Sequence, residues 1–251
     1  MNPTSMDQIK KVALITGSAT GIGRSVAWRL AELGFAIAVN YSRSAAEAEE
    51  TAEGVRARGA PVIVEKASVA EESAVRAMVA RTVVALGGLD VLVNNAATTH
   101  FIPHDDLEGA TEAVWDEIFA VNVKGAFFAC RAAMPHLKVR RGNIMNVASV
   151  AGIAGSGSSI PYAASKGAVI TMTKSLAKAF APEVRVNAVA PGPVQTRWLA
   201  DHQDMVAEAM KVTPLQRPAT PEDIADGVVF LATTAALMTG HVLVIDGGRT
   251  M

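Results

Sequence analysis

The sequence is short of net charge, and this shortage excludes several classes of protein. Only 19% of the 251 residues are charged, and 23 Lys and Arg against 24 Asp and Glu leave a net charge of −1. So neutral a chain lacks the basic surface with which proteins bind nucleic acid or anionic membranes, so we expect neither partner. Hydrophobic residues make up 50% of the chain, which is enough to bury a large core and excludes a disordered protein.

Cysteine, metal-binding patterns and long apolar runs are also scarce. The single cysteine, Cys130, excludes an internal disulfide bond and a four-thiolate zinc site, and we interpret it as a small buried hydrophobic residue. His100 and His104 flank Pro103, which breaks a helix, so their spacing predicts no metal site. Residues 1–10 form a polar tail without the apolar segment of a signal peptide, and no apolar run approaches the roughly 18 to 20 residues that cross a bilayer. We therefore expect a cytoplasmic protein that holds no metal.

Short apolar runs alternate along the chain with longer segments of helical periodicity. In the first such segment, Ile22, Val26, Leu30 and Leu33 recur on one helix face. Strands buried on both faces appear as continuous apolar runs, and strand–helix alternation forces parallel pairing. The pattern predicts a single α/β domain over residues 11–251: a Rossmann-type, doubly wound, mainly parallel seven-stranded sheet with helices on both faces. An eight-unit βα barrel is the alternative that counting runs leaves open.

The boundaries of these segments can be predicted individually. The predicted strands are Val12–Thr16, Ala36–Tyr41, Val62–Glu65, Val91–Asn94, Asn143–Val147, Arg185–Ala190 and Val242–Asp246. The predicted helical segments are Ile22–Leu33, Ala45–Arg58, Glu72–Leu86, Thr111–Leu137, Ser165–Phe180 and Pro221–Thr233. The Gly/Ser-rich stretch Gly152–Ser159 is expected to be a short loop, and no linker, repeat or composition shift divides the chain.

The first predicted strand leads directly into a glycine-rich turn, after which a helical pattern begins at once. Glycines at such a turn allow a tight bend and let the backbone approach a pyrophosphate. The helix N-terminus then offers unpaired N–H groups to the phosphates. This placement favours nucleotide binding over an ordinary strand–helix turn. The expected contacts are Gly17, Thr20, Gly21, Ile22 and Gly23.

The spacing T-G-x-x-x-G-I-G differs from the G-x-G-x-x-G fingerprint and resembles that of the short-chain dehydrogenase/reductase family. Further motifs similar to those of the family follow in order over nearly the whole chain. They are Asn94–Ala97, Asn122 in V-N-V-K-G, Ser149, Tyr162 and Lys166 in Y-A-A-S-K, Pro191–Thr196 and Val244–Gly248. The resemblance implies an oxidoreductase that transfers hydride between a nicotinamide and a small ketone or secondary alcohol.

Tyr162 and Lys166 lie four residues apart, so a helix would place both on one face. A free tyrosine has a pKa near 10, and lowering it to about 7 requires roughly 4 kcal/mol, which one ammonium at roughly 4 Å supplies at an effective dielectric of about 20. We therefore expect Lys166 to lower the pKa of Tyr162. The resemblance implies that Tyr162 is the general acid/base and that Ser149 orients the substrate oxygen. It also implies that Lys166 binds the nicotinamide ribose and that Asn122 takes part in a water-mediated proton relay with Lys166.

The end of the second predicted strand bears on the choice between NAD and NADP. An acid there would accept hydrogen bonds from the ribose hydroxyls and repel a 2′-phosphate. By resemblance to the family, Tyr41 occupies the position where NAD-selective members carry Asp. Residues 36–46 contain no acidic residue. Ser42 and Arg43 can donate hydrogen bonds to a phosphate. We therefore predict NADP(H), with NAD(H) as the alternative.

The resemblance implies further cofactor contacts and two departures from the family pattern. Thr20 stands where NADP-preferring relatives often carry a basic residue, and Ser68, followed by Val69, stands where an adenine-contacting Asp is typical. Val194 and Thr196 resemble a clamp on the carboxamide. The remaining expected contacts are Asn95, Ala96, Ala97, Tyr162, Lys166, Pro191 and Gly192.

The substrate and partners are less well defined by the residues. Residues 197–217 are expected to form a partly apolar substrate lid. The chain resembles 3-oxoacyl-acyl-carrier-protein reductases, which need basic residues to dock an acidic carrier protein. Arg140 and Arg141 could serve this purpose, but Pro182-Glu183 stands where a second basic residue would be useful. Docking of a carrier protein is therefore possible but not supported by the sequence. The resemblance also implies a homotetramer with long helices and residues 242–251 at interfaces.

Three alternatives stay open at this point. An NAD-dependent alcohol or sugar dehydrogenase of the same family would use the same catalytic residues. A non-catalytic dinucleotide sensor would keep the glycine-rich turn but lose Tyr162 or Lys166, and both are present. A sugar-nucleotide epimerase or dehydratase would need a longer C-terminal substrate domain than this chain has room for.

Overall fold

A computed structural model describes residues 10–251, so the polar tail predicted over residues 1–10 lies almost wholly outside the described residues. The strands form one sheet in the order β3-β2-β1-β4-β5-β6-β7. Every neighbouring pair in that order runs parallel. The predicted doubly wound α/β fold is confirmed, and the barrel alternative is wrong because the sheet is open, with β3 and β7 at its edges.

The strands begin and end within one residue of the predicted positions. This agreement arises because the inner strands β1, β4 and β5 are short runs buried on both faces, whereas the edge strands β3 and β7 are partly exposed but still apolar over most of their length. Alternate residues of the first strand feed two separate cores: Ala13 and Ile15 pack on one face of the sheet, and Val12 and Leu14 on the other. The strands are β1 (Val12–Ile15), β2 (Ala36–Tyr41), β3 (Val62–Lys66), β4 (Val91–Asn94), β5 (Asn143–Val147), β6 (Arg185–Pro191) and β7 (Val242–Ile245).

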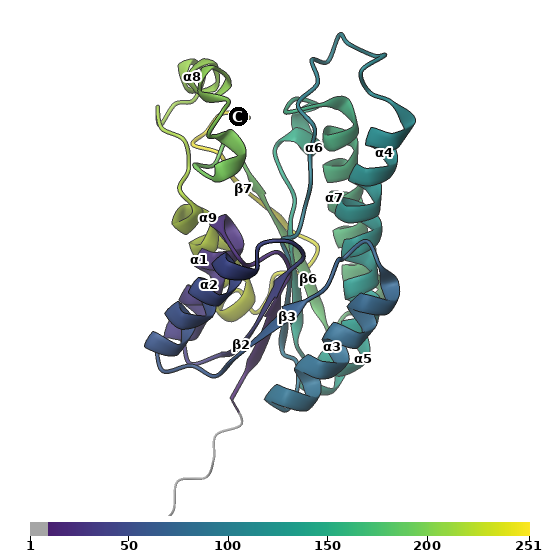
Figure 1. The fold of residues 1–251 in the computed structure, drawn as a ribbon, viewed down its shortest axis with the longest axis vertical. Helices are drawn as coiled ribbons and strands as arrows, with labels where there is room; N and C mark the ends of the chain where they lie inside the picture. The colour runs from purple at the N-terminus through teal and green to yellow at the C-terminus, as the bar shows by residue number, and fades with distance from the viewer. Residues whose placement is uncertain (1–9) are drawn as a thin grey trace, which may run out of the picture.

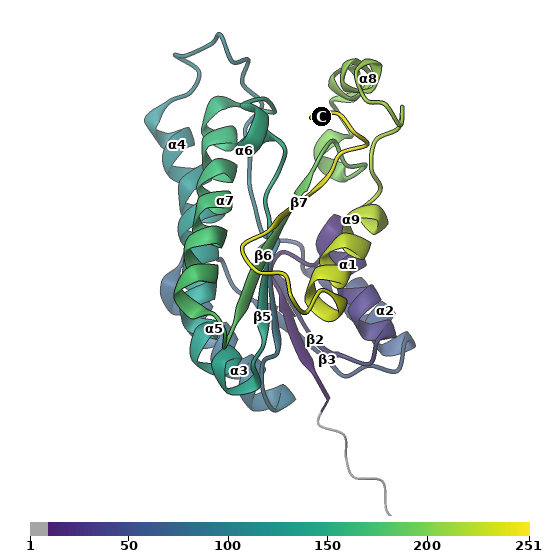
Figure 2. The ribbon, with the colours of Figure 1, turned by 180° about the vertical axis from the view of Figure 1, so that it is seen from behind.

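Helices cover both faces of the sheet. Figures 1 and 2 show α1, α2 and α9 on one side and α3, α5 and α7 on the other. The helices are α1 (Gly21–Glu32), α2 (Ala45–Ala57), α3 (Glu72–Leu86), α4 (Glu112–Phe119), α5 (Ala126–Arg140), α6 (Ala151–Ala154), α7 (Ile160–Phe180), α8 (Gln203–Lys211) and α9 (Pro221–Val229). Two π-helical segments, η1 (Ala120–Gly125) and η3 (Phe230–Thr234), and a 3-10 turn, η2 (Arg197–Leu199), complete the elements.

The structure corrects several predicted helices. The segment Thr111–Leu137 is not one regular helix, because η1 separates α4 from α5. Likewise, Pro221–Thr233 ends in the π-helical η3. The predicted loop Gly152–Ser159 is wrong at its start, where α6 forms a single turn. These irregular turns depend on packing against other elements, which periodicity does not report.

Helix α7 begins at Ile160, five residues before the predicted Ser165. Ser159 is the N-cap, and its hydroxyl accepts a hydrogen bond from the Tyr162 N–H at 3.4 Å. Pro161 lies in the first turn, where its missing N–H costs nothing. The cap and the proline place Tyr162 in the first turn of the helix, above the end of the sheet.

The carboxyl ends of the parallel strands all lie at one end of the sheet, which we call the ligand-binding edge to distinguish it from the edge strands β3 and β7. In Figure 1, α8 and the segment between β4 and α4 rise beyond this edge on opposite sides of the molecule. In open α/β sheets, ligands bind at this edge. Among residues 10–251, no helix combines the length and apolar character required to span a bilayer.

Candidate active site

The glycine-rich turn between β1 and α1 is packed so closely that side chains would not fit. A Cβ on Gly17 would lie 2.8 Å from the Cα of Ala96, and a Cβ on Gly23 would lie 2.5 Å from the Nδ2 of Asn95. Gly17 and Gly21 also have positive φ angles of 62° and 57°. The close packing and the positive φ angles therefore explain why three of the predicted nucleotide contacts, Gly17, Gly21 and Gly23, are glycines. This explanation does not depend on which ligand they contact.

Two polar residues that the sequence did not single out hold this turn in place. Asn40, only 1% exposed, accepts a hydrogen bond from the Gly17 N–H at 3.0 Å through Oδ1. Its Nδ2 donates to the carbonyl oxygens of Glu65 and Ala67, each at 3.1 Å. The Thr16 hydroxyl accepts from the Asn95 N–H at 3.0 Å and so joins the turn to the end of β4. The one available signal was a polar asparagine inside an apolar strand.

The first turn of α1 is available to a ligand. Thr20 precedes the helix in an extended conformation, and its side chain does not cap the helix. The N–H groups of the first turn are therefore free to meet an anion, with Ile22 partly exposed within that turn. Such an open helix start beside tightly packed glycines fits the pyrophosphate of a dinucleotide.

The residues predicted for the adenosine end lie on neighbouring strand ends. Tyr41 ends β2, and the exposed Ser42 and Arg43 follow it. Ser68 and Val69 follow β3, which pairs with β2 so that Tyr41 is opposite Lys66. Residues 36–46 contain no acidic residue, but Glu47, in the first turn of α2, follows directly after them.

The residues predicted for the nicotinamide end follow β6. Pro191 is the last residue of β6, and the Gly192 N–H donates to the Ile245 carbonyl at 2.9 Å. Val194 forms an isolated bridge with Ala219. The methyl group of Thr196 would be 3.3 Å from a Cβ on Gly21, so the predicted lid starts directly above the glycine-rich turn.

Tyr162 and Lys166 lie on one face of α7, as predicted. The Lys166 Nζ is 5.6 Å from the centroid of the Tyr162 ring. It donates a hydrogen bond to the backbone carbonyl of Val147, at the end of β5, at 2.8 Å. Lys166 is 4% exposed, so its charge is held in a nearly dry environment.

The expectation that Lys166 brings the pKa of Tyr162 to about 7 is wrong for this arrangement. Burial raises the pKa of Tyr162 to about 12, although a side-chain hydrogen bond with Ser149 acts in the opposite direction. Burial also lowers the pKa of Lys166 to about 8. Both shifts have the same cause, because desolvation favours the neutral form of each group. Desolvation, which the Coulomb attraction between two charges does not include, decides the direction of both shifts.

Asn122 connects η1 to the start of α7 through its side chain, and it is 3% exposed. Its Oδ1 accepts from the Thr98 N–H at 2.8 Å, and its Nδ2 donates to the Thr98 carbonyl and to the Ser165 hydroxyl, each at 3.0 Å. These contacts position the segment that follows Asn95, Ala96 and Ala97. The proton relay with Lys166 stays a prediction.

Ser149 follows β5, and its hydroxyl accepts a hydrogen bond from the Ala151 N–H at 3.1 Å. The fold therefore brings Ser149, from the end of β5, together with Tyr162, from the first turn of α7. Ser149 and Tyr162 are 13 positions apart in the printed sequence and are joined through α6 and the Ser159 cap. A hydroxyl and a phenol side by side suit binding of one carbonyl or alcohol oxygen.

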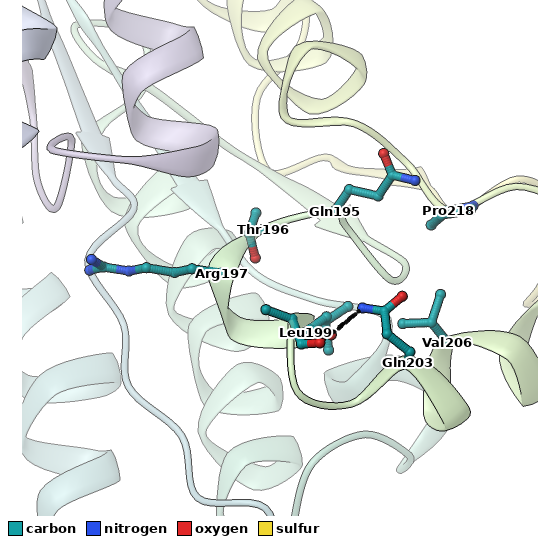
Figure 3. A pocket seen from close by; sticks show the side chains of 8 residues that line it. Gln195, Thr196, Arg197, Leu199, Gln203, Val206 and Pro218 are labelled. Atoms are coloured by element: carbon teal, nitrogen blue, oxygen red, sulfur yellow. Dashed lines mark hydrogen bonds between the residues drawn. The ribbon is translucent and has the colours of Figure 1, made fainter.

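The predicted lid contains η2 and α8 and surrounds a pocket of about 440 Å³. Figure 3 shows Leu199, Gln203 and Val206 around this pocket. Two aromatic contacts join the lid to the site: Trp198 lies edge-on to Tyr162 at 6.4 Å between centroids, and His202 stacks on Phe101 at 3.6 Å. The Phe101–His202 contact joins segments far apart in sequence, which is why sequence reasoning did not find it.

Metal-ligating side chains do not gather anywhere in residues 10–251 in a group that could hold an ion. His104 and His100 remain in the segment between β4 and α4, where His100 pairs with Glu117 at 2.9 Å.

Comparisons with known proteins agree with this geometry. A family profile described as Enoyl-(Acyl carrier protein) reductase matches residues 17–250. The chain is 46% identical over 241 residues to ketoacyl reductase 2 of the granaticin polyketide synthase of Streptomyces violaceoruber, covering 94% of this chain and 95% of that protein. It is 39% identical over 248 residues to a 3-oxoacyl-[acyl-carrier-protein] reductase of Staphylococcus aureus, covering 97% and 100%. A solved short-chain dehydrogenase/reductase of Serratia marcescens superposes with a TM-score of 0.90 at 34% identity, covering 96% and 98%.

Proposed function

The chain belongs to the short-chain dehydrogenase/reductase family of oxidoreductases, and on this premise we propose that it reduces a ketone to a secondary alcohol with NADPH. The proposed substrate class is a 3-oxoacyl thioester. The observation that carries the proposal is the placement of the Tyr162 phenol. The phenol lies beside Ser149 and Lys166 and contacts the lid residue Trp198. It is at the carboxyl ends of the strands, the same end of the sheet as the glycine-rich turn.

The residues at this edge fit a nicotinamide dinucleotide, which supplies the hydride when bound. The first turn of α1 and the packed Gly17 and Gly23 suit the pyrophosphate. Ser42 and Arg43 would hold the adenosine ribose and its 2′-phosphate. Lys166 would hold the nicotinamide ribose. The remaining contacts proposed from the sequence lie in the first turn of α1 or at the carboxyl ends of β2, β3, β4 and β6, on the same side of the sheet.

Tyr162 has the protonation state that reduction requires. With a pKa of about 12, its phenol carries a proton throughout the physiological range and can donate it to the carbonyl oxygen as the carbonyl carbon becomes an alcohol carbon. Ser149 would donate a second hydrogen bond to the same oxygen and orient it. The Lys166 ammonium, 5.6 Å from the Tyr162 ring centroid, stabilises the phenolate that is left.

The lid supports a substrate that is partly apolar. Leu199, Val206 and Pro218 line the pocket together with Gln195 and Gln203. This combination suits a short acyl chain that carries polar carbonyl groups. The two relatives described above are named as ketoacyl reductases, which supports the same class.

A homotetramer is the proposed assembly. An apolar groove of about 400 Å³ lies between α5 and α7, where Phe127, Met134 and Phe180 are among its lining residues. A second copy of the chain would bury this surface. Light scattering should give four times the 26.1 kDa chain mass, and a monomeric mass would contradict the proposal.

The activity is tested by following NADPH consumption with a short 3-oxoacyl thioester, in parallel for the natural chain and Tyr162→Phe. Turnover by the natural chain and a loss of about 100-fold or more in the variant would support Tyr162 as the acid. Equal turnover in both would contradict the mechanism. Absence of turnover by the natural chain, with turnover of another ketone or of a sugar or alcohol, would contradict the thioester assignment.

A further inference from the structure

Arg197 is the first residue of the lid, yet its side chain leaves the lid. Its Nη1 donates a hydrogen bond to the Ser44 hydroxyl at 3.2 Å, across 153 positions of the chain. In Figure 3 the side chain points away from Gln203 and Val206. The Arg197 side chain therefore extends from the start of the lid to the corner between β2 and α2.

This corner is where the adenosine ribose would lie if the proposed function holds. Ser42 and Arg43 occupy the two positions before Ser44, and both are exposed. Thr196, directly before Arg197, packs above Gly21 of the glycine-rich turn. The Arg197 guanidinium thus reaches over the proposed pyrophosphate position and meets the β2–α2 corner beyond it.

The guanidinium is only loosely neutralised at this corner. Its ion-pair contact with Glu47 is long, at 3.9 Å, and the two side chains are 58% and 41% exposed. Ser44 precedes α2 but its hydroxyl does not cap that helix. Arg197 consequently has donors to spare for a doubly charged oxyanion, which would bind a guanidinium more strongly than a hydroxyl does.

We propose that Arg197 binds the 2′-phosphate of NADP(H), and so joins the substrate lid to the cofactor. The proposal rests on the proposed cofactor and adds a second cation, contributed by the lid, to Arg43. Cofactor binding would then hold the start of the lid against the β2–α2 corner, because the same phosphate contacts both. NADH, which lacks the phosphate, would not make this connection.

The test compares NADPH and NADH dissociation constants, measured by fluorescence titration without substrate, for the natural chain and Arg197→Ala. Loss of one charge-assisted contact should raise the NADPH constant about tenfold, which corresponds to about 1.4 kcal/mol, and leave the NADH constant within about twofold. Arg197→Lys should keep part of the NADPH affinity. Arg76→Ala is the matched control, since Arg76 is 55% exposed but lies on α3, and it should change neither constant.

Three other results of these titrations would overturn the proposal. An equal rise for both cofactors would place Arg197 on the pyrophosphate and overturn the 2′-phosphate assignment. No change for either would show that Arg197 stays with Ser44 and Glu47, and would also overturn it. If the natural chain binds NADH as tightly as NADPH, the proposed cofactor itself is wrong. That failure is visible before any variant is measured.

Discussion

The rings of Phe101 and His202 stack with their centroids 3.6 Å apart and their planes 22° from parallel. Phe101 belongs to the segment after β4, and His202 immediately precedes α8 in the lid. The Ile102 N–H donates to the Ser158 carbonyl at 2.8 Å, so Phe101 is anchored to the segment before α7. This contact therefore fastens the lid to the part of the site that carries Tyr162.

Removing either ring should loosen the lid. For Phe101→Ala and His202→Ala we expect KM for the ketone to rise about threefold to tenfold, because an aromatic pair contributes about 0.5 to 1.5 kcal/mol. The NADH dissociation constant should change little. His202→Phe is the control that keeps a stacked ring. Steady-state kinetics check the prediction, and a rise for His202→Phe as large as that for His202→Ala would show that stacking is not the reason.

Gly23→Ala should prevent cofactor binding. The new Cβ would lie 2.5 Å from the Asn95 Nδ2 and 2.7 Å from the Ser18 Cα, so the start of α1 would have to move away from the strand ends. We expect a rise in the NADPH dissociation constant of at least about tenfold and a loss of about 1 to 3 kcal/mol in the free energy of unfolding. Titration and urea unfolding measure the two effects.

Gly167→Ala is the matched substitution for this comparison. Gly167 lies within α7, and a Cβ there would meet only the Gly152 carbonyl oxygen at an ordinary 3.5 Å. Alanine is favoured over glycine inside a helix, so the free energy of unfolding should rise by about 0.5 to 1 kcal/mol. A loss of stability equal to that of Gly23→Ala would contradict the steric explanation.

Lys166→Met should stabilise the fold near neutral pH. Since the folded pKa of Lys166 is about 8, against 10.5 for the ordinary side chain, the unfolded chain binds more protons between these values. The stability of the natural chain therefore rises with pH through this range, and its buried ammonium costs about 3 kcal/mol at about pH 7. Met removes that cost but also the hydrogen bond to Val147, so we expect a net gain of about 1 to 3 kcal/mol.

The pH dependence separates this effect from ordinary packing. Urea unfolding at about pH 7 and about pH 9.5 should show the advantage of Lys166→Met shrinking by about 2 kcal/mol at the higher pH, because the natural chain has then lost most of its buried charge. An advantage that is the same at both values would show that the pKa of Lys166 is not lowered.

Asn122→Ala should destabilise the protein by about 2 to 4 kcal/mol. The substitution leaves the Thr98 N–H and carbonyl and the buried Ser165 hydroxyl without their amide partner. A double-mutant cycle with Ser165→Ala, measured by urea unfolding, should give a coupling of about 1 kcal/mol. Additive effects would indicate that the Asn122–Ser165 hydrogen bond contributes nothing to stability.

The sequence by itself determined the sheet and the residues along its ligand-binding edge. Apolar runs such as Val12–Ile15 are readable because a strand buried on both faces needs nearly every residue to be apolar. Once the strands are parallel, their carboxyl ends lie at one end of the sheet, so residues at or just after those ends, such as Tyr41 and Ser149, lie along the same side of the molecule. Helical spacing likewise placed Tyr162 and Lys166 on one face.

Only the tertiary structure decided the features that depend on distant partners. The contacts of His202 with Phe101 and of Arg197 with Ser44 join segments that no local pattern relates. The π-helical η1 likewise interrupts a segment whose periodicity is helical throughout. The pKa of Tyr162 moves upward rather than downward because burial, a property of the whole fold, costs the phenolate more than its neighbours return. Spacing specified which groups meet, and the packed surroundings specified their protonation.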